Sequence, residues 1–233
     1  MPKKQKEIEK NQGLYFFKNA DKGFHEKWSK DRHPMNIPHP FRAVIAGPPH
    51  SGKSTMIKNL LMFNKPFFKE IIVVHCDPEY TKEYEDLGEE IELISEIPPP
   101  EGFTGKEKTL VILDDLEYKN LNKLQRKNLD RLFGFVSTHK NISVCLTAQD
   151  VFNIPTGVRR CANIWMLWRV CDLDALLNIA RKLNYSAKQL KFLFDNYVKT
   201  NHDFIMIDNT NKTPYPLRRN GLEFIDSEQI KMI

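Results

Sequence analysis

Apolar residues along this chain fall into two kinds of pattern. Short, nearly continuous apolar runs are typical of strands buried on both faces of a parallel sheet. Between these runs, apolar residues recur at a spacing of three or four, which indicates amphipathic helices. The predicted strands cover residues 42–47, 70–76, 108–117, 142–150, 162–169 and 203–208, with a further candidate at 91–94, and the predicted helices cover 53–63, 121–141, 172–183 and 186–199.

This alternation of strands and helices predicts an α/β fold with a mostly parallel central sheet flanked by helices. Asp172 is a candidate N-cap for the helix that follows it. Residues after 208 show neither pattern, and we expect them to be irregular. The apolar side of the helix over 121–141 consists of Leu121, Leu124, Leu129, Leu132 and Phe133.

A chain of 233 residues has the size of one domain. We expect residues 36–233 to form this domain and residues 1–35 to form a basic, partly ordered arm. Residues 1–42 hold ten Lys and Arg against five Asp and Glu, which accounts for the whole net charge of +5. A solvated tail and an arm that contacts a polyanion both fit this charge. The possible anchors of the arm are Phe16, Phe17, Phe24 and Trp28.

Composition indicates a protein that stays inside a cell. No apolar window is long enough to cross a bilayer, and the charged start of the chain lacks the apolar segment of a secretory signal.

Residues 77–101 carry ten acids and one lysine, which predicts a solvent-facing excursion. The four cysteines form no CxxC pair, so we expect structural thiols rather than a zinc site. They are Cys76, Cys145, Cys161 and Cys171.

A phosphate-binding motif lies between the first predicted strand and the first predicted helix. Residues 47–54, GPPHSGKS, match GxxxxGK[ST] in the strand–loop–helix context that this motif requires. Its glycines let backbone N–H groups face phosphate oxygens, and the helix start adds the positive end of its dipole. Lys53 would reach the β- and γ-phosphates of ATP, Ser54 would ligate Mg²⁺, and Thr55 would face the α-phosphate. The candidate nucleotide-binding residues are Gly47, Pro48, Pro49, His50, Ser51, Gly52, Lys53, Ser54 and Thr55, with His50 as a spacer in the loop rather than a base.

Two aspartates follow the apolar run of the strand predicted at 108–117. The sequence TLVILDD brings Asp114 and Asp115 to the carboxyl edge of the sheet, beside the phosphate loop. Asp114 fits the residue that holds Mg²⁺ through its water shell, and Asp115 is placed to polarise the attacking water. Glu117 is a weaker alternative base. In an alternative interpretation the aspartates cap the next turn, but this would explain one carboxylate better than two.

Polar residues also follow the strand predicted at 142–150. Gln149 would lie near the γ-phosphate, where an amide can sense the phosphate and orient water. The next stretch, IPTGVRR, contains Arg159 and Arg160. These are either surface charges or an arginine finger that stabilises transition-state charge on a neighbouring subunit's nucleotide.

Absent motifs narrow the class of nucleotide-binding protein. The stretch DNTNKTP does not provide the NKxD motif of a GTPase, and no LSGGQ-type signature of a transporter ATPase is present. A kinase of a nucleotide or small molecule would need an Arg-rich lid, for which TGVRR is a thin candidate, and the paired acids favour water as the nucleophile. A nucleotide-binding assembly or scaffold protein without turnover is the other alternative.

Residues 36–183 resemble the DNA-packaging ATPases of the FtsK–HerA superfamily, in the branch of poxvirus-like large DNA viruses, virophages and polinton-type elements. The resemblance rests on HPFRAVIAGPPHSGKST, LVILDDL, THKNISVCLTAQDVFNIPTGVRRCANIWMLWR and CDLDALLNIARKL. The third stretch is the most specific, because it places His139, Asn141 and Ser143 before the strand, Gln149 after it, and then an arginine and Asn163.

The resemblance implies a P-loop ATPase of the additional-strand (ASCE) class, with an extra strand between those that precede the phosphate loop and the aspartates. It implies a pentameric or hexameric ring that pumps double-stranded DNA into a viral capsid and contacts capsid proteins. It further implies location in the host cytoplasm or viral factory, or association with the virion, without a membrane anchor. Gln149 matches the family's sensor and Arg159 or Arg160 its arginine, although some relatives carry an arginine where this chain has Thr138. Asp115 stands where many members have glutamate, as expected for the viral branch.

Translocation along a duplex needs a sequence-independent grip on phosphates, which Lys and Arg supply. The basic arm and the helix after the aspartates are two candidates for this contact. A solvated helix face with matching acids is the alternative for the helix, and Arg218 and Arg219 are equally ambiguous. The basic residues of the helix region are Lys119, Lys123, Arg126, Lys127 and Arg131.

Overall fold

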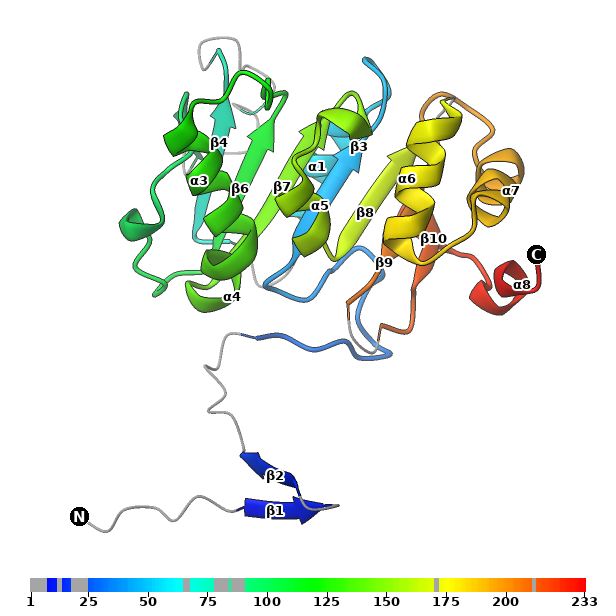
Figure 1. Ribbon diagram of the computed structural model, residues 1–233, viewed down its shortest axis with the longest axis horizontal. Helices are drawn as coiled ribbons and strands as arrows, with labels where there is room; N and C mark the ends of the chain where they lie inside the picture. The colour runs from blue at the N-terminus through cyan, green and yellow to red at the C-terminus, as the bar shows by residue number, and fades with distance from the viewer. Residues whose placement is uncertain are drawn as a thin grey trace.

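A nine-stranded sheet forms the centre of the molecule (Figure 1). The computed structural model describes residues 8–11, 14–17, 25–64, 68–77, 84, 91–169, 172–210 and 213–233. The strands in the order β5-β4-β6-β7-β3-β8 are parallel, and β9, β10 and β11 extend the sheet in antiparallel pairs. The predicted fold class is therefore confirmed. The strands of the sheet are β3 (Arg42–Ala46), β4 (Glu70–His75), β5 (Ile91–Ile94), β6 (Thr109–Asp114), β7 (Ile142–Ala148), β8 (Ile164–Trp168), β9 (Phe204–Asp208), β10 (Leu217–Arg219) and β11 (Glu223–Phe224), and a separate hairpin pairs β1 (Ile8–Asn11) with β2 (Leu14–Phe17).

The strand order determines which loops meet. Strand β7 lies between β3, which precedes the phosphate loop, and β6, which ends in the aspartates. This is the extra strand that the resemblance implied. Because parallel strands end at one edge of a sheet, the loops after β3, β6 and β7 lie side by side at the carboxyl edge, where ligands bind in open α/β sheets.

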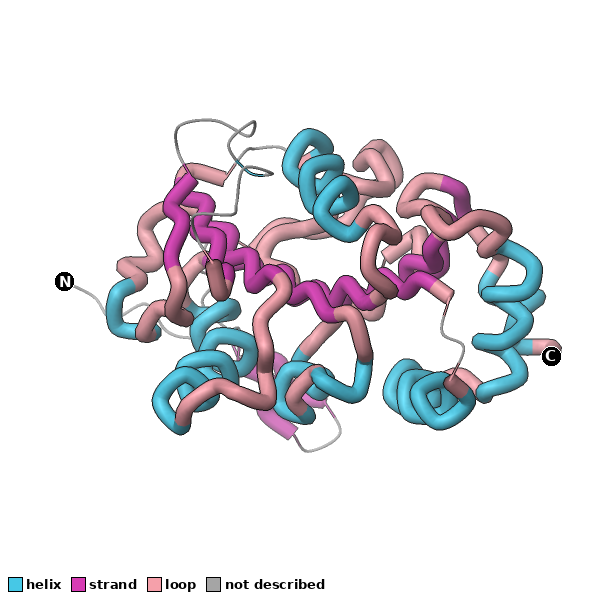
Figure 2. Tube along the Cα trace, turned by 90° about the horizontal axis from the view of Figure 1, so that it is seen from above, coloured by secondary structure: helices cyan, strands magenta, loops and turns pink. Residues whose placement is uncertain are grey.

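Helices cover both faces of the sheet (Figures 1 and 2). Val44 packs in a core with Leu129 and Leu176, whereas Ile45, the next residue of β3, packs in a second core with Ile57. Successive side chains of a strand point to opposite faces, so burial on both faces explains the continuous apolar runs. Helix α1 (Lys53–Phe63) lies on one face, and α3 (Lys123–Arg131), α5 (Thr156–Cys161) and α6 (Leu173–Leu183) lie on the other.

The other helical segments are short or peripheral. The Asp172 side chain accepts a hydrogen bond from the Asp174 N–H, so the predicted N-cap of α6 is confirmed. In the described part of the chain, no helix combines the length and the apolar character needed to span a bilayer. The remaining segments are α4 (Ser137–His139), α7 (Ala187–Tyr197), α8 (Ser227–Lys231), the 3₁₀ turns η2 (Pro100–Gly102) and η4 (Val151–Asn153), and the π-helical η3 (Leu132–Val136).

Two details of the prediction are wrong. The helix expected over 121–141 begins at Lys123 and passes through the π-helical η3, and the side chain of Leu124 is 61% exposed rather than part of the apolar side. The tail after 208 is not irregular, because β10 and β11 extend the sheet and α8 packs Ile230 into the core. Strand β10 escaped prediction because it is short and carries two arginines.

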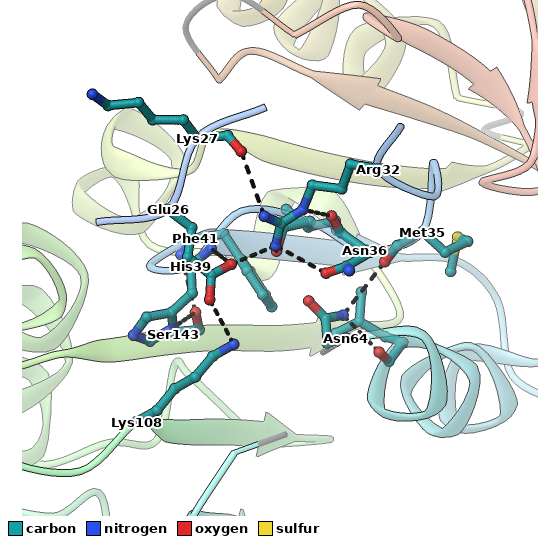
Figure 3. Close-up of polar contacts among 12 residues, drawn as sticks. Glu26, Lys27, Arg32, Met35, Asn36, His39, Phe41, Asn64, Lys108 and Ser143 are labelled. Atoms are coloured by element: carbon teal, nitrogen blue, oxygen red, sulfur yellow. Dashed lines mark hydrogen bonds and ion pairs between the residues drawn. The ribbon is translucent and has the colours of Figure 1, made fainter. Parts of the chain in front are cut away.

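Residues 25–41 lie against the amino edge of the sheet. Glu26 accepts hydrogen bonds from the guanidinium of Arg32, from Lys108 Nζ at 2.9 Å and from the His39 N–H at 3.1 Å (Figure 3). Trp28 Nε1 donates to Thr210 Oγ1 at 2.7 Å, so this predicted anchor is confirmed. The side chains of Phe16 and Phe17 and the whole of Phe24 lie outside the described residues. The division of the chain at 35/36 remains a proposal.

Candidate functional site

The phosphate loop is held in shape by its neighbours. The Gly47 N–H donates to the Ala148 carbonyl of β7 at 3.0 Å. A Cβ at Gly47 would lie 2.7 Å from Cβ of Trp168, so only glycine fits at the start of the loop. Gly52 has a φ of +99° and His50 a φ of +58°, which are left-handed conformations. The loop therefore takes a curved path that ends at the first turn of α1.

Lys53 lies at the centre of this loop. Its Nζ donates to the carbonyls of Gly47 and Pro48, each at 2.9 Å. Partial burial lowers the pKa of Lys53, and the negative charges of Asp115 and Asp114 oppose this effect. The loop that holds Lys53 follows β3 and the aspartates end and follow β6, so both stand at the carboxyl edge of the sheet.

Asp114 is buried and held by two hydroxyl groups. It is 8% exposed, and Tyr84 Oη donates to its Oδ2 while Thr147 Oγ1 donates to its Oδ1, each at 2.6 Å. Tyr118, also buried beside the aspartates, donates its hydroxyl to the Thr147 carbonyl at 2.8 Å. Burial raises the pKa of Tyr118 well above its usual value, and the charges of Asp114 and Asp115 add to this effect. The tyrosine hydroxyl therefore stays a donor.

Asp115 is exposed and has the positive φ of +47°. Its N–H donates to Thr147 Oγ1 at 2.9 Å, and Gln149 Nε2 donates to its Oδ1 at 2.9 Å. The structure thus brings Asp114, Asp115 and Gln149 together. Thr147 was missed by the sequence reasoning, although it stands two residues before Gln149 in the quoted stretch. Tyr84 was missed because nothing distinguishes it within the acidic excursion.

Two hollows flank the loop at the carboxyl edge. One, of about 420 Å³, is lined by Asp115, Tyr118 and Gln149. The other, of about 780 Å³, is lined by Thr55 and His202 and by the aromatic rings of Trp168 and Phe204, among others. Because Lys53 and Thr55 line the second hollow and Asp115 lines the first, a nucleotide laid along the loop would place its terminal phosphate toward Asp115 and its base in the larger hollow.

Hard oxygen donors are present for a magnesium ion. Mg²⁺ is bound in proteins by one or two carboxylates together with substrate phosphates and water. Asp114 and the hydroxyl of Ser54 are donors of this kind, so they fit the ion. Among the described residues, no group of three or more His, Cys, Asp or Glu side chains forms a separate metal centre.

The two arginines of α5 are not brought to this site. The residues that follow α5 reach the amino edge of the sheet, where the Arg42 N–H donates to Asn163 Oδ1 at 2.8 Å. Arg159 donates to Thr156 Oγ1 at 3.3 Å within its own helix, and Arg160 is exposed. Their role on a neighbouring subunit's nucleotide stays a prediction.

Other residues of the sequence analysis have structural partners. Asn141 Oδ1 and Ser143 Oγ each lie 2.7 Å from a ring nitrogen of buried His39, at the amino edge. Arg218 is fully buried in an ion pair with Asp208 at 2.8 Å, so it cannot face DNA.

The basic helix is only partly free for a partner. Arg126 donates to the carbonyls of Lys119 and Leu121, each at 2.8 Å, and Arg131 pairs with Glu101. Lys119, Lys123 and Lys127 are exposed. Arg126 is exposed as well, so these four side chains are the exposed members of the basic set that was a candidate for DNA contact.

The cysteines differ in burial. Cys145 is buried, and burial raises the pKa of its thiol. Cys76 is exposed although it follows the apolar run of β4, and Cys161 is half-buried. Cys171 lies outside the described residues.

The strand–loop–helix motif and the strand order together define the fold of P-loop NTPases with an additional strand. No protein-family model and no curated protein matches the sequence. Several solved structures, by contrast, are similar to this chain. The genome packaging NTPase B204 of Sulfolobus turreted icosahedral virus 2, in complex with AMPPCP, is 18% identical with a TM-score of 0.54, over 77% of this chain and 96% of that chain.

Two more structures show the same likeness. B204, the DNA-packaging ATPase of Sulfolobus turreted icosahedral virus, is 17% identical with a TM-score of 0.56, over 80% of this chain and 99% of that chain. The pCW3 conjugation coupling protein TcpA, in its monomer form with ATPγS, is 13% identical with a TM-score of 0.54, over 96% of this chain and 78% of that chain. At these identities the likeness establishes the fold, which is the fold that the resemblance predicted.

Proposed function

We propose that this chain is an ATP-hydrolysing motor that translocates double-stranded DNA into a viral capsid. The observation that carries the proposal is the meeting of three strand ends at one site. There, the loop that holds Lys53 lies at the same edge of the sheet as Asp114 and Asp115, and Gln149 is bonded to Asp115. A loop for phosphates, a carboxylate for a metal and a second carboxylate for water are the parts that hydrolysis of a nucleoside triphosphate requires.

Each residue has a distinct part in the proposed reaction. The loop amides and Lys53 bind the β- and γ-phosphates once Nζ leaves the carbonyls of Gly47 and Pro48. Ser54 and Asp114 hold Mg²⁺, which when bound neutralises charge on the phosphates. Asp115 accepts a proton from water as the water attacks the γ-phosphate, and ADP and phosphate leave.

Gln149 links the base to the nucleotide. Its amide donates to Asp115 Oδ1, and the same amide lies at the edge where the γ-phosphate would be sensed. Arg159 or Arg160 acts on the nucleotide of the next subunit in a pentameric or hexameric ring. This arrangement makes hydrolysis dependent on assembly, because α5 does not bring either arginine to its own chain's loop.

The proposal of DNA and capsid partners rests on the similar solved structures and on the surface charge. The similar structures include proteins described as genome packaging or DNA-packaging NTPases, which supports double-stranded DNA as the partner. The exposed Lys119, Lys123 and Lys127 follow Asp115 along the chain and would offer phosphate contacts close to the site of hydrolysis. Action in the host cytoplasm, viral factory or virion follows from this assignment.

Steady-state hydrolysis of ATP with and without linear duplex DNA, together with the molar mass in solution, tests the proposal. We expect DNA to stimulate hydrolysis in a ring-sized species. Formation of ADP by a monomer only when an acceptor is added would instead identify a kinase. Tight ATP binding without turnover in the assembled, DNA-bound protein would identify a nucleotide-dependent scaffold.

A further inference from the structure

We propose that Thr147 and Tyr84 are positioning residues that orient the carboxylate of Asp114 for its part in holding Mg²⁺. This inference rests on the proposed function, since it assigns partners to the metal-holding carboxylate of the same site. Both residues lie outside the phosphate loop, and the sequence analysis gave neither of them a role.

The geometry places one hydroxyl on each oxygen of the carboxylate. Thr147 Oγ1 donates to Oδ1 and Tyr84 Oη donates to Oδ2, and both distances are 2.6 Å, in the range of hydrogen bonds between a hydroxyl and an ionised carboxylate. All three side chains are buried, so bulk water does not compete for these bonds. These two hydrogen bonds form a clamp that fixes the rotamer of Asp114 from two sides.

The clamp also limits how Asp114 meets a metal ion. A carboxylate offers about four lone-pair sites, two on each oxygen. The two hydroxyl donors occupy one site on each oxygen. Each oxygen therefore keeps about one site, which suits a hydrogen bond from a metal-bound water better than bidentate contact with the ion. Mg²⁺ gives up water reluctantly, so this contact through water fits the ion's chemistry.

Thr147 has a second task that Tyr84 does not share. While its hydroxyl proton goes to Asp114, its oxygen accepts the Asp115 N–H at 2.9 Å. Asp115 has a positive φ of +47°, which this bond helps to hold. Loss of the Thr147 hydroxyl would therefore disturb the carboxylate for the metal and the carboxylate for water together, whereas the Tyr84 hydroxyl donates to the first of them.

The test uses the full chain and compares isosteric variants. Thr147→Val removes the hydroxyl, Thr147→Ser keeps it, and Tyr84→Phe removes the other donor. Thr109→Val is the matched control, because Thr109 is buried at the opposite end of β6 and its hydroxyl also donates to a carboxylate, Glu70 Oε2, at 2.8 Å. Thermal melting of each variant shows whether the protein is folded.

Calorimetric binding of AMPPCP over a Mg²⁺ titration gives the readout, and it requires no turnover. We expect Thr147→Val to raise the half-saturating Mg²⁺ concentration by about tenfold or more, as loss of a partner of a metal ligand does. Tyr84→Phe should raise it by a smaller factor, and Thr147→Ser and Thr109→Val should stay within about threefold of the wild type.

Several results would overturn the inference. An unchanged Mg²⁺ requirement in folded Thr147→Val would do so, and so would an equal loss in Thr109→Val. Wild-type binding that ignores Mg²⁺ would remove the metal site itself. If the wild type binds AMPPCP with Mg²⁺ dependence but neither hydrolyses ATP nor responds to DNA, the proposed function fails while the clamp stands or falls on the titration.

Discussion

Polar side chains at the two edges of the central sheet have different kinds of hydrogen-bond partner. At the amino edge, His39 lies between Asn141 and Ser143, and Glu26 accepts bonds from Arg32 and Lys108. At the carboxyl edge, Lys53 donates to carbonyls of its own loop rather than to an acid. Left-handed backbone occurs there at His50, Gly52 and Asp115, and at the amino edge at Asn141.

Buried donors beside the loop extend this contrast. The hydroxyl of Ser51 and the indole N–H of Trp168 are buried without a hydrogen-bond partner among the described residues. Such groups cost free energy unless a ligand or water satisfies them. At the amino edge Arg42 Nε and Asn64 Oδ1 are also buried without a partner, but Ser51 and Trp168 line the larger hollow, where a ligand can reach them. We therefore interpret the amino edge as a structural seam and the carboxyl edge as the functional one.

The contrast between the two edges would fail most clearly if Asp115 were not the catalytic base. Asp115→Asn keeps the size of the side chain and removes its ability to accept a proton. We expect kcat for ATP hydrolysis to fall by about a thousandfold, the middle of the range for general base catalysis, while ATP binding persists. Single-turnover hydrolysis and calorimetric ATP binding measure the two effects separately.

Glu117→Gln is the control for this change. Glu117 also follows β6, but its carboxylate bonds to the Asn120 amide on the exposed loop. We expect its kcat to stay within about threefold of the wild type, far less than the loss expected from removal of a base. If Glu117→Gln loses activity and Asp115→Asn does not, the roles of the two residues are exchanged.

The shape of the loop gives a second, smaller effect. Gly47→Ala would place a Cβ 2.7 Å from Cβ of Trp168, where the strand backbone cannot move away. Overpacking of this kind costs about 1–3 kcal/mol, so we expect ATP affinity to fall by about ten- to hundredfold. Gly102→Ala is the control, since a Cβ there meets no atom within 4 Å. Equal affinities in the two variants would show that contact with Trp168 does not shape the loop.

The sequence predicted the carboxyl edge well because its chemistry is local. The phosphate loop is contiguous, and Asp114, Asp115 and Gln149 each follow an apolar run that marks a buried strand. Strand order is not local, and it is what brings Thr147 of β7 against Asp114 of β6. A threonine in an apolar run carries no sign of its partner, so the clamp required coordinates.

The C-terminal strands β10 and β11 were not predicted, for a different physical reason. Arg218 looks like a surface charge in sequence, yet it is fully buried, bonded to Asp208 and to the Pro34 carbonyl, with its guanidinium 5.5 Å from the centre of the Trp28 ring. A buried charge of this kind is tolerated only when it is paired and hydrogen-bonded. Periodicity cannot reveal this environment, because the pairing of β9 with β10 and the distant residues Pro34 and Trp28 create it.

The amino edge supplies the smallest expected effect, through the titration of His39. Burial lowers the pKa of His39 from about 6.5 to about 4, although its bond with Asn141 opposes the shift. The unfolded chain therefore takes up a proton as the pH falls below 6.5, while the folded chain stays neutral until about pH 4. Stability from this group is fully present above pH 6.5 and is lost on acidification through that window.

Between pH 7 and pH 5.5, this difference amounts to about 1 kcal/mol of unfolding free energy. His39→Gln cannot titrate, so we expect its loss of stability over that interval, measured by urea unfolding, to be smaller than the wild type's by about this amount. His139→Gln, at an exposed histidine bonded to the Phe135 carbonyl, should keep the wild-type difference. ATP affinity at pH 7 should be the same in all three proteins, because His39 stands at the edge opposite the phosphate loop. A loss of affinity in His39→Gln would show that the two edges are coupled, and the division between a structural seam and a functional edge would have to be abandoned.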